Sequence, residues 1–121
     1  ASSMIDQGWY KNEFIDLVQK RGAKIIEARG SSSAASAASA AIDHMRDWTL
    51  GSAADNWVSM GIYSQGMYGI DPDLMFSYPA VCRDRQFTVV QDLQLNAFSQ
   101  HMIARSEQEL IKERDMVKDL L

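Results

Sequence analysis

The sequence of 121 residues has few of the residues that mark specialised classes of protein. Its single cysteine, Cys82, cannot form an internal disulfide, and this favours a reducing compartment. No apolar run approaches the ~20 residues of a transmembrane helix. No basic start followed by an apolar block indicates a secretion signal. We therefore expect a cytoplasmic protein, with an organelle as the alternative.

Strong charge is also missing. The formal net charge is -4 and the isoelectric point is about 5.0, which argues against nucleic acid or an anionic membrane as the main partner. The hydrophobic content of 46% is typical of a folded globular chain, and the length suits one domain. The opening Ala1-Ser2-Ser3 resembles an added sequence or the remainder of a cleavage. We therefore expect residues 1–8 to be an added or truncated start and residues 9–121 to be the domain.

The motifs of a self-sufficient active site are missing as well. The chain has neither the GxGxxG pattern of dinucleotide binding nor the GxxxxGK[ST] pattern of a phosphate loop. His44 and His101 lie far apart and have no serine, cysteine or carboxylate at a catalytic spacing, so we interpret both as surface or capping residues. Two histidines and one cysteine give no metal-ligand cluster, and Asp71-Pro72-Asp73 is interpreted as a turn. We expect neither a catalytic residue nor a metal in this chain.

The chain does contain clear secondary-structure patterns. Helical periodicity covers 9–28, with a break near Lys20–Ala23 because Gly22 weakens the helix, and Gly30 is a stop signal. Three short β-rich runs at 57–63, 74–82 and 87–90 predict an antiparallel meander, because their connections are too short for parallel crossovers. Pro79 indicates an edge strand or a bulge.

The last segment predicts a helix of more than twenty residues that Asn96 caps. Its buried side is predicted to carry Ile103, Leu110, Val117 and Leu121. Its solvated side is predicted to carry Arg105, Glu109, Lys112, Glu113 and Lys118. The predicted fold class is α+β, with helices packed on a small antiparallel sheet and a long C-terminal helix.

The most unusual stretch is the serine–alanine run between Gly30 and Trp48. Residues this small form either a flexible spacer or a helix whose backbone is approached closely. A spacer would be rich in glycine and would not end in apolar residues at helical spacing, so the helix is favoured. It is expected to begin at one of the serines after Gly30, where hydroxyls and free N–H groups suit an anion. The physics alone leaves this anion site and a merely capped, tightly packed helix equally open.

Several segments in order carry a resemblance to a known family. They are EFIDLVQKRGAKIIEARGSSSAASAASAAIDHMRDW (13–48), WVSMGIYSQGMYGI (57–70) and DLMFSYPAV (73–81). Together they resemble the C-terminal, substrate-binding domain of the lactate/malate dehydrogenase family, and within it the malate dehydrogenases of the cytosolic type. The resemblance covers essentially the whole chain after Gln7. It implies the fold of that domain, without the Rossmann domain that precedes it in the family.

The resemblance also implies roles for two serines. Ser32 corresponds to the hydroxyl-bearing residue that lines the family's substrate pocket, and Ser36 corresponds to a position that faces the nicotinamide ring. The stripe of Ala34, Ala38 and Ala41 corresponds to a subunit-interface helix, which implies a homodimer. The family's acid–base histidine, its orienting aspartate and its carboxylate-binding arginines all precede this segment.

We therefore expect the C-terminal domain of an NAD- or NADP-dependent malate dehydrogenase, which interconverts malate and oxaloacetate by hydride transfer. The chain by itself is expected to be inactive and to bind no cofactor. The rival interpretation is a non-enzymatic interaction module that uses the small-residue helix only as a docking surface.

Overall fold

A computed structural model describes residues 4–53 and 55–120 of the protein. The chain divides into two compact units, one from Ala1 to Asp43 and one from His44 to Leu121, and each is described by itself. Among the described residues, no helix is both long enough and apolar enough to cross a membrane.

The first unit is helical. It contains α1 (Gln7–Trp9), a π-helical turn η2 (Tyr10–Phe14), α2 (Ile15–Gln19) and α3 (Arg21–Arg29), and it includes the first ten residues of α4 (Ala34–Leu50). Asp6 caps the start, because its carboxylate accepts a hydrogen bond of 2.6 Å from the N–H of Trp9. The helical run therefore begins slightly before the predicted start at residue 9.

Both predicted interruptions of this unit are confirmed. The helix breaks at Lys20, where φ is -92° and ψ is 2°. α3 then ends at Gly30, which takes a left-handed backbone with φ of 67° and donates a hydrogen bond of 2.8 Å to the carbonyl of Ile26. None of the helical residues of this unit is fully buried, and the apolar side chains of Leu17 and Val18 are 43% and 54% exposed.

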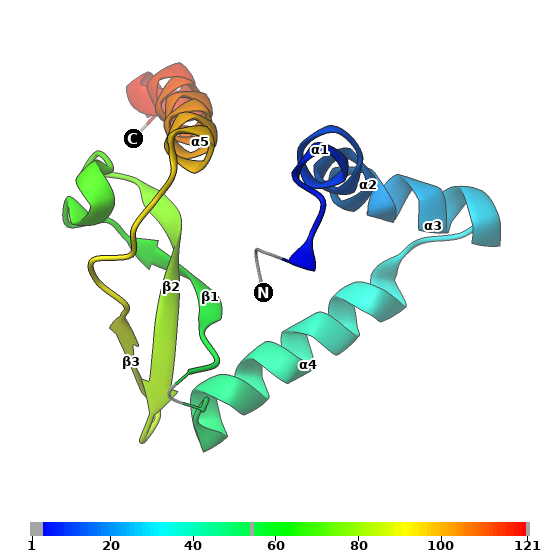
Figure 1. Ribbon diagram of the computed structural model, residues 1–121, viewed down its shortest axis with the longest axis horizontal. Coiled ribbons are helices and arrows are strands. Elements are labelled where there is room, and N and C mark those ends of the chain that lie inside the picture. The colour runs from blue at the N-terminus through cyan, green and yellow to red at the C-terminus, as the bar shows by residue number, and fades with distance from the viewer. Residues whose placement is uncertain (1–3, 54, 121) are drawn as a thin grey trace. The chain divides into compact units, whose positions relative to one another are not determined.

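The second unit is built on the predicted antiparallel meander. β1 (Val58–Tyr63), β2 (Met75–Arg83) and β3 (Gln86–Val89) form one sheet with β2 in the middle (Figure 1). Val58 lies opposite Ala80 on one side of β2, and Val89 lies opposite Ala80 on the other. A short 3₁₀ turn, η3 (Met67–Gly69), lies between β1 and β2. The fold class predicted from the sequence is confirmed.

The interpretation of Pro79 as an edge or bulge residue is wrong, because Pro79 lies within the central strand, opposite Ser59 of β1. Its carbonyl accepts a hydrogen bond of 2.9 Å from the N–H of Val90, just after β3 ends at Val89. The proline nitrogen has no proton for the carbonyl of Val90, and the hydroxyl of Tyr68 donates to that carbonyl instead. A central proline is therefore tolerated because β3 is short and a tyrosine supplies the missing donor.

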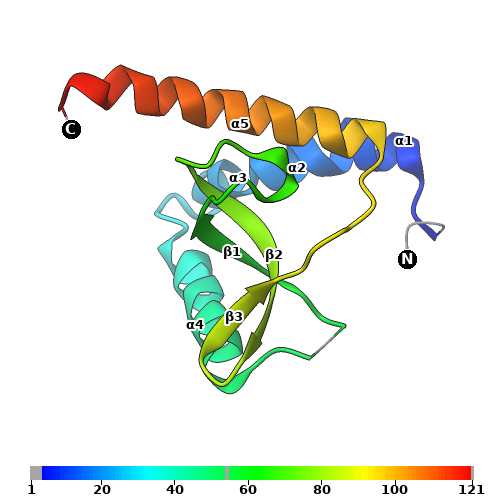
Figure 2. The same cartoon turned by 90° about the vertical axis from the view of Figure 1, so that its left-hand side faces the viewer.

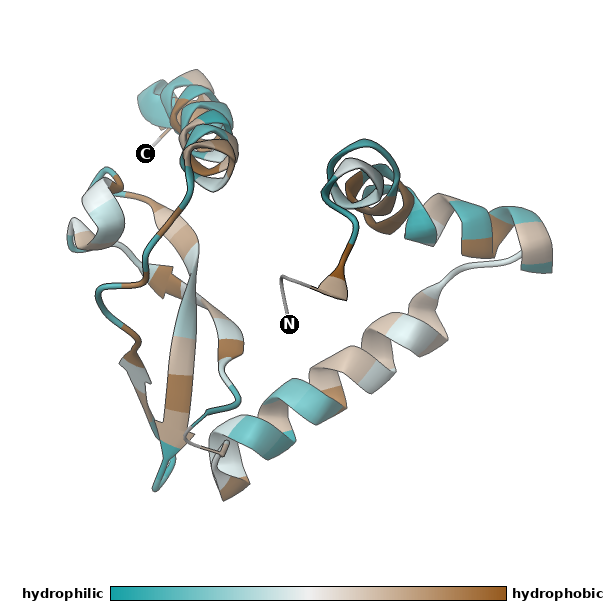
Figure 3. Cartoon of the chain, viewed as in Figure 1, coloured by the Kyte–Doolittle hydropathy of each residue, from teal (hydrophilic) through white to brown (hydrophobic). Residues whose placement is uncertain are grey.

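The core of this unit lies on one face of the sheet. The fully buried apolar side chains come mainly from β2 and the turn before it: Met60, Ile70, Leu74, Tyr78, Ala80 and Cys82. In Figure 3, brown bands that mark hydrophobic residues occur on both β1 and β2. The opposite face has no fully buried side chain of β1 or β2, and there the hydroxyls of Ser59 and Ser77 lie 2.6 Å apart.

The long helix α5 (Ala97–Val117) follows, and its start is confirmed, since Asn96 accepts a hydrogen bond of 2.8 Å from the N–H of Ser99. Ile103, Leu110 and Ile111 pack against the core. The predicted burial of Val117 is wrong, because its side chain is 42% exposed where α5 extends beyond the small sheet (Figure 2). Leu121 lies outside the described residues.

The end of α4 is held by the second unit's hairpin and central strand. The indole N–H of Trp48 donates to the carbonyl of Arg85 at 3.0 Å, and its ring meets Phe87 edge-on. Beyond the helix, the N–H of Ser52 donates to the carbonyl of Cys82 at 2.9 Å, and the hydroxyl of Ser52 accepts from the N–H of Cys82 at 3.0 Å. Ser52 thus occupies the place beside β2 that β1, starting at Val58, does not reach.

Candidate functional site

The serine segment links α3 to α4. Gly30 turns the chain at the end of α3, residues 31–33 have no regular structure, and α4 begins at Ala34. An ideal Cβ on Gly22 would lie 3.9 Å from the hydroxyl oxygen of Ser33, so this linker passes close to the first turn of α3. The segment is therefore ordered by contacts within the first unit, and the prediction of a helix rather than a spacer is confirmed.

The two predicted site serines have complementary hydrogen-bonding capacity. The hydroxyl of Ser32 accepts from the N–H of Ala34 at 3.1 Å, which uses an oxygen lone pair and leaves its proton available for an outside acceptor. The hydroxyl of Ser36 donates to the carbonyl of Ser33 at 2.8 Å, which uses its proton and leaves lone pairs for an outside donor. Both side chains are exposed. The first therefore suits a carboxylate, and the second suits an N–H group.

The small side chains of α4 are exposed as well. Ala34, Ala38 and Ala41 recur at helical spacing and present almost no side-chain bulk. Such a face permits close approach of another backbone. It has no reactive group of its own and so contributes no chemistry.

The other reactive side chains form no second centre. His44 is partly buried and His101 is exposed. Within residues 4–53 and 55–120, no group of three or more histidine, cysteine or acidic residues is placed to hold a metal. Cys82 is buried with its sulfur 3.7 Å from that of Met60, and burial raises the pKa of its thiol, which opposes the reactive thiolate form.

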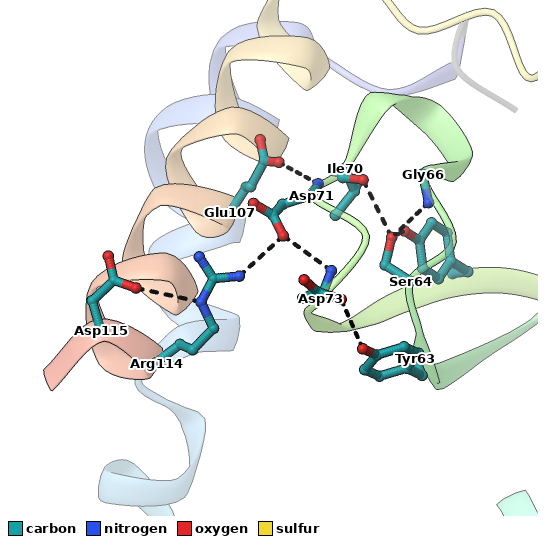
Figure 4. Close-up of polar contacts among 10 residues, drawn as sticks. Tyr63, Ser64, Gly66, Ile70, Asp71, Asp73, Glu107, Arg114 and Asp115 are labelled. Carbon is teal, nitrogen blue, oxygen red and sulfur yellow. Dashed lines mark hydrogen bonds and ion pairs between the residues drawn. The ribbon is translucent and has the colours of Figure 1, made fainter. Parts of the chain in front are cut away.

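A polar network that the sequence analysis missed joins the turn before β2 to α5 (Figure 4). The carboxylate of Asp71 accepts from Arg114 at 3.0 Å, and the carboxylate of Glu107 accepts from the N–H of Asp71 at 2.7 Å. Asp71 also accepts from the N–H of Asp73 at 3.0 Å, and Asp73 accepts from the hydroxyl of Tyr63 at 2.8 Å. The network therefore fixes one turn of the sheet to two points of α5.

A signal for this network exists in the sequence. Glu107 and Arg114 follow Ile103 by four and eleven residues, which places them on the same helix face as Ile103 and Leu110. Polar residues within an apolar stripe indicate a specific partner. The predicted solvated side omits both residues, and the ion pair of Arg105 with Glu109 on that side is indeed exposed.

The network also sets local charge. The pKa of Asp71 is lowered below its ordinary value of 3.8, first by the hydrogen bond from the N–H of Asp73 and then by Arg114. The pKa of Arg114 is raised, mainly by its bond to Asp71, and that of Tyr63 is raised by its bond to Asp73. These groups stabilise one another in their ordinary charge states, and none is brought into the range of acid–base catalysis near neutral pH.

Replacing Asp71 with asparagine is expected to lower the urea midpoint of unfolding near neutral pH. The asparagine keeps an oxygen for the N–H of Asp73 but loses the charge that pairs with Arg114. Because the folded pKa of Asp71 is lowered, its stabilisation is present above the unfolded pKa of ~4 and is lost as pH falls through the folded value.

The difference from the unsubstituted protein should therefore be smaller at pH ~3 than near neutral pH, because pH ~3 lies below the unfolded pKa of ~4 and the stabilisation declines from there. Glu109→Gln, which breaks the exposed pair with Arg105, is the matched control and should change the midpoint little at either pH. If Asp71→Asn lowers the urea midpoint by the same amount at both pH values, the charge of Asp71 does not contribute to stability.

Comparison with known proteins shows which family has this architecture. Residues 2–121 match the model of the lactate/malate dehydrogenase α/β C-terminal domain. Malate dehydrogenase from Naegleria fowleri is 50% identical with a TM-score of 0.89 over 96% of this chain. Lactate dehydrogenase from Trichomonas vaginalis in complex with NADH and oxamate is 31% identical with a TM-score of 0.87 over 97% of the chain. An apo variant of the Trichomonas enzyme is 30% identical with a TM-score of 0.86, again over 97%.

In each case the chain spans only 36% of the length of the solved relative. The match covers both compact units and includes the serine segment, the sheet and α5. The resemblance of the sequence segments is thereby confirmed. The chain belongs to the lactate/malate dehydrogenase family, as the C-terminal domain of its members.

Proposed function

We propose that this domain forms the substrate side of a malate dehydrogenase, whose complete protein interconverts malate and oxaloacetate. The observation that carries the proposal is the identity of 50% with a malate dehydrogenase, against 30–31% with a lactate dehydrogenase. The complementary hydroxyls of Ser32 and Ser36 support it, because they offer a donor and an acceptor one helical turn apart.

The reaction removes a hydride from C2 of malate and a proton from the C2 hydroxyl, which leaves the carbonyl of oxaloacetate. A nicotinamide cofactor, held in part by Ser36, would supply the hydride acceptor in this direction and the hydride donor in the other. The proton goes to an acid–base group that, by the family resemblance, precedes this segment in the complete protein. This chain therefore contributes binding and orientation and no proton transfer.

We assign the substrate contact to Ser32, whose free hydroxyl proton can be donated to a carboxylate oxygen of malate or oxaloacetate. We assign the cofactor contact to Ser36, whose free lone pairs can accept from the carboxamide N–H of a nicotinamide. An NAD-type cofactor is supported by the NADH named in the complex of the Trichomonas relative. NADP is the alternative cofactor.

The small face of α4 is proposed to be the contact with a second copy in a homodimer. Ala34, Ala38 and Ala41 are exposed, and small side chains at these positions let two helices approach closely across a two-fold axis. This assignment does not affect the chemistry of the serines.

Reduction of oxaloacetate by NADH or NADPH tests the proposed function, with loss of cofactor absorbance as the measurement. The full-length protein that carries this domain is expected to turn over, and the 121-residue chain alone is expected to show none. Turnover by the isolated chain would contradict the assignment of the acid–base group to another part of the protein. No turnover by the folded full-length protein would contradict the enzymatic function and favour the interaction module.

A further inference from the structure

The most basic part of this acidic chain is the stretch from α3 to the serine segment. Residues 20–29 contain four cations and one carboxylate, Glu27. The cations are Lys20, Arg21, Lys24 and Arg29. The chain as a whole has a formal net charge of -4. The positive charge is therefore concentrated locally rather than spread over the surface.

Three of these cations are available to the solvent. Lys20 is paired with Asp16 at 2.7 Å, which offsets much of its charge. The side chains of Arg21, Lys24 and Arg29 are exposed, and none lies within ion-pair distance of a carboxylate of residues 4–53 and 55–120. Their field is thus not cancelled by a neighbouring pair.

The geometry of the first unit places this charge beside the serines. The linker after Gly30 passes the start of α3, where the Cβ position of Gly22 lies 3.9 Å from the hydroxyl of Ser33. Arg29 follows Gly22 by seven residues and so shares its helix face, while Arg21 and Lys24 lie one turn apart at the same end of α3 as Gly22. Arg29 therefore lies on the face of α3 that the linker passes, and Arg21 and Lys24 lie in the same first turn as Gly22 but on other sides of the helix.

We propose that Arg21, Lys24 and Arg29 form an electrostatic guide that draws the dicarboxylate substrate toward Ser32. The inference rests on the proposed function, since it needs a substrate with two carboxylates at this segment. Like-signed charges beside a site raise the local concentration of an oppositely charged substrate and its association rate, typically by ~10–1,000-fold. The guide acts before chemistry, so it raises kcat/KM and leaves kcat unchanged.

The test neutralises all three cations in the full-length protein, as Arg21→Gln, Lys24→Gln and Arg29→Gln together. At an ionic strength of ~10 mM, where the Debye length is ~30 Å, kcat/KM for oxaloacetate is expected to fall about ten-fold with kcat unchanged. At ~1 M salt the Debye length is ~3 Å, and the two proteins should become nearly equal. Lys24→Arg, which keeps the charge, should behave like the unsubstituted protein at every salt concentration.

A matched control removes the same charge elsewhere. Arg83, Arg85 and Lys112 are exposed cations of the second unit, and their joint replacement by glutamine should leave kcat/KM within about two-fold. An equal loss in the control would show that net charge, and not this guide, matters. A loss that persists at high salt, or that falls on kcat, would overturn the guide in favour of a direct role at the site.

These outcomes are distinct from failure of the proposed function. If the unsubstituted full-length protein reduces no oxaloacetate, the proposed function fails before any comparison of variants. The guide can then be tested without turnover. Calorimetry measures the dissociation constant of oxalate, a dicarboxylate probe, at low and at high salt. Binding that weakens with salt in the unsubstituted protein, but not in the triple variant, supports the guide, and identical salt dependence in both overturns it.

Discussion

Replacing Ser32 with tryptophan is expected to lower kcat/KM for oxaloacetate by at least about 100-fold in the full-length protein, or ~2.7 kcal/mol of transition-state stabilisation. Ser32 lies just before the start of α4, and its hydroxyl proton is free to be donated. An indole there removes the donor and fills the space that a substrate carboxylate would occupy. The measurement is steady-state reduction of oxaloacetate.

Two companion variants separate the role of the hydroxyl from that of bulk. Ser32→Ala removes only one hydrogen bond to a charged group and should cost about ten-fold in kcat/KM. Ser106→Trp introduces the same indole at an exposed position of α5 and should leave kcat/KM within about two-fold. If Ser32→Trp changes kcat/KM as little as Ser106→Trp does, Ser32 does not border the substrate.

Replacing Gly51 with valine is expected to lower the free energy of unfolding by about 2–4 kcal/mol. Gly51 has φ of 93°, a backbone conformation that a β-branched residue adopts only under strain. Its added Cβ would also lie 3.3 Å from the carbonyl of Cys82, the group that accepts from the N–H of Ser52. The substitution therefore weakens the join between α4 and β2.

Gly61→Val is the matched control for this prediction. Gly61 lies on the exposed face of β1, and no atom would come within 4 Å of its added Cβ. Valine suits a strand, so the change should be neutral or slightly stabilising. Urea unfolding of both variants measures the difference, and equal stabilities would show that the turn at Gly51 imposes no strain.

Local signals predicted most of the fold. Gly30 and Asn96 mark a helix end and a helix start in the sequence because a left-handed glycine and a capping side chain act on their immediate neighbours. The strand segments were recognisable because they are short runs rich in β-forming residues, with turn-like segments between them. Such features depend on contacts a few residues apart.

Features that depend on distant residues escaped prediction. Pro79 is tolerated in the central strand only because β3 ends at Val89 and Tyr68 donates to the carbonyl of Val90. The burial of α5 ends before Val117 because the sheet beneath it is small, and strand number does not appear in the pattern of the helix. Both predictions, for Pro79 and for Val117, were therefore wrong because they depend on residues far away in the sequence.

The candidate site was predicted in part. The helical nature of the serine segment followed from its own residues, whereas the roles of Ser32 and Ser36 came from the family resemblance. The structure adds the hydrogen-bonding state of each hydroxyl, which no sequence pattern contains. Arg114 and Glu107 were missed because their common partner, Asp71, lies some forty residues away in the chain.

Substrate preference tests most directly whether this domain belongs to a malate dehydrogenase. The measurement is the ratio of kcat/KM for oxaloacetate to that for pyruvate, determined with the full-length protein and NADH. We expect a ratio of at least about 100, because the second carboxylate of oxaloacetate accepts charge-assisted hydrogen bonds that pyruvate cannot make. A ratio below one would contradict the claim and identify the protein as a lactate dehydrogenase.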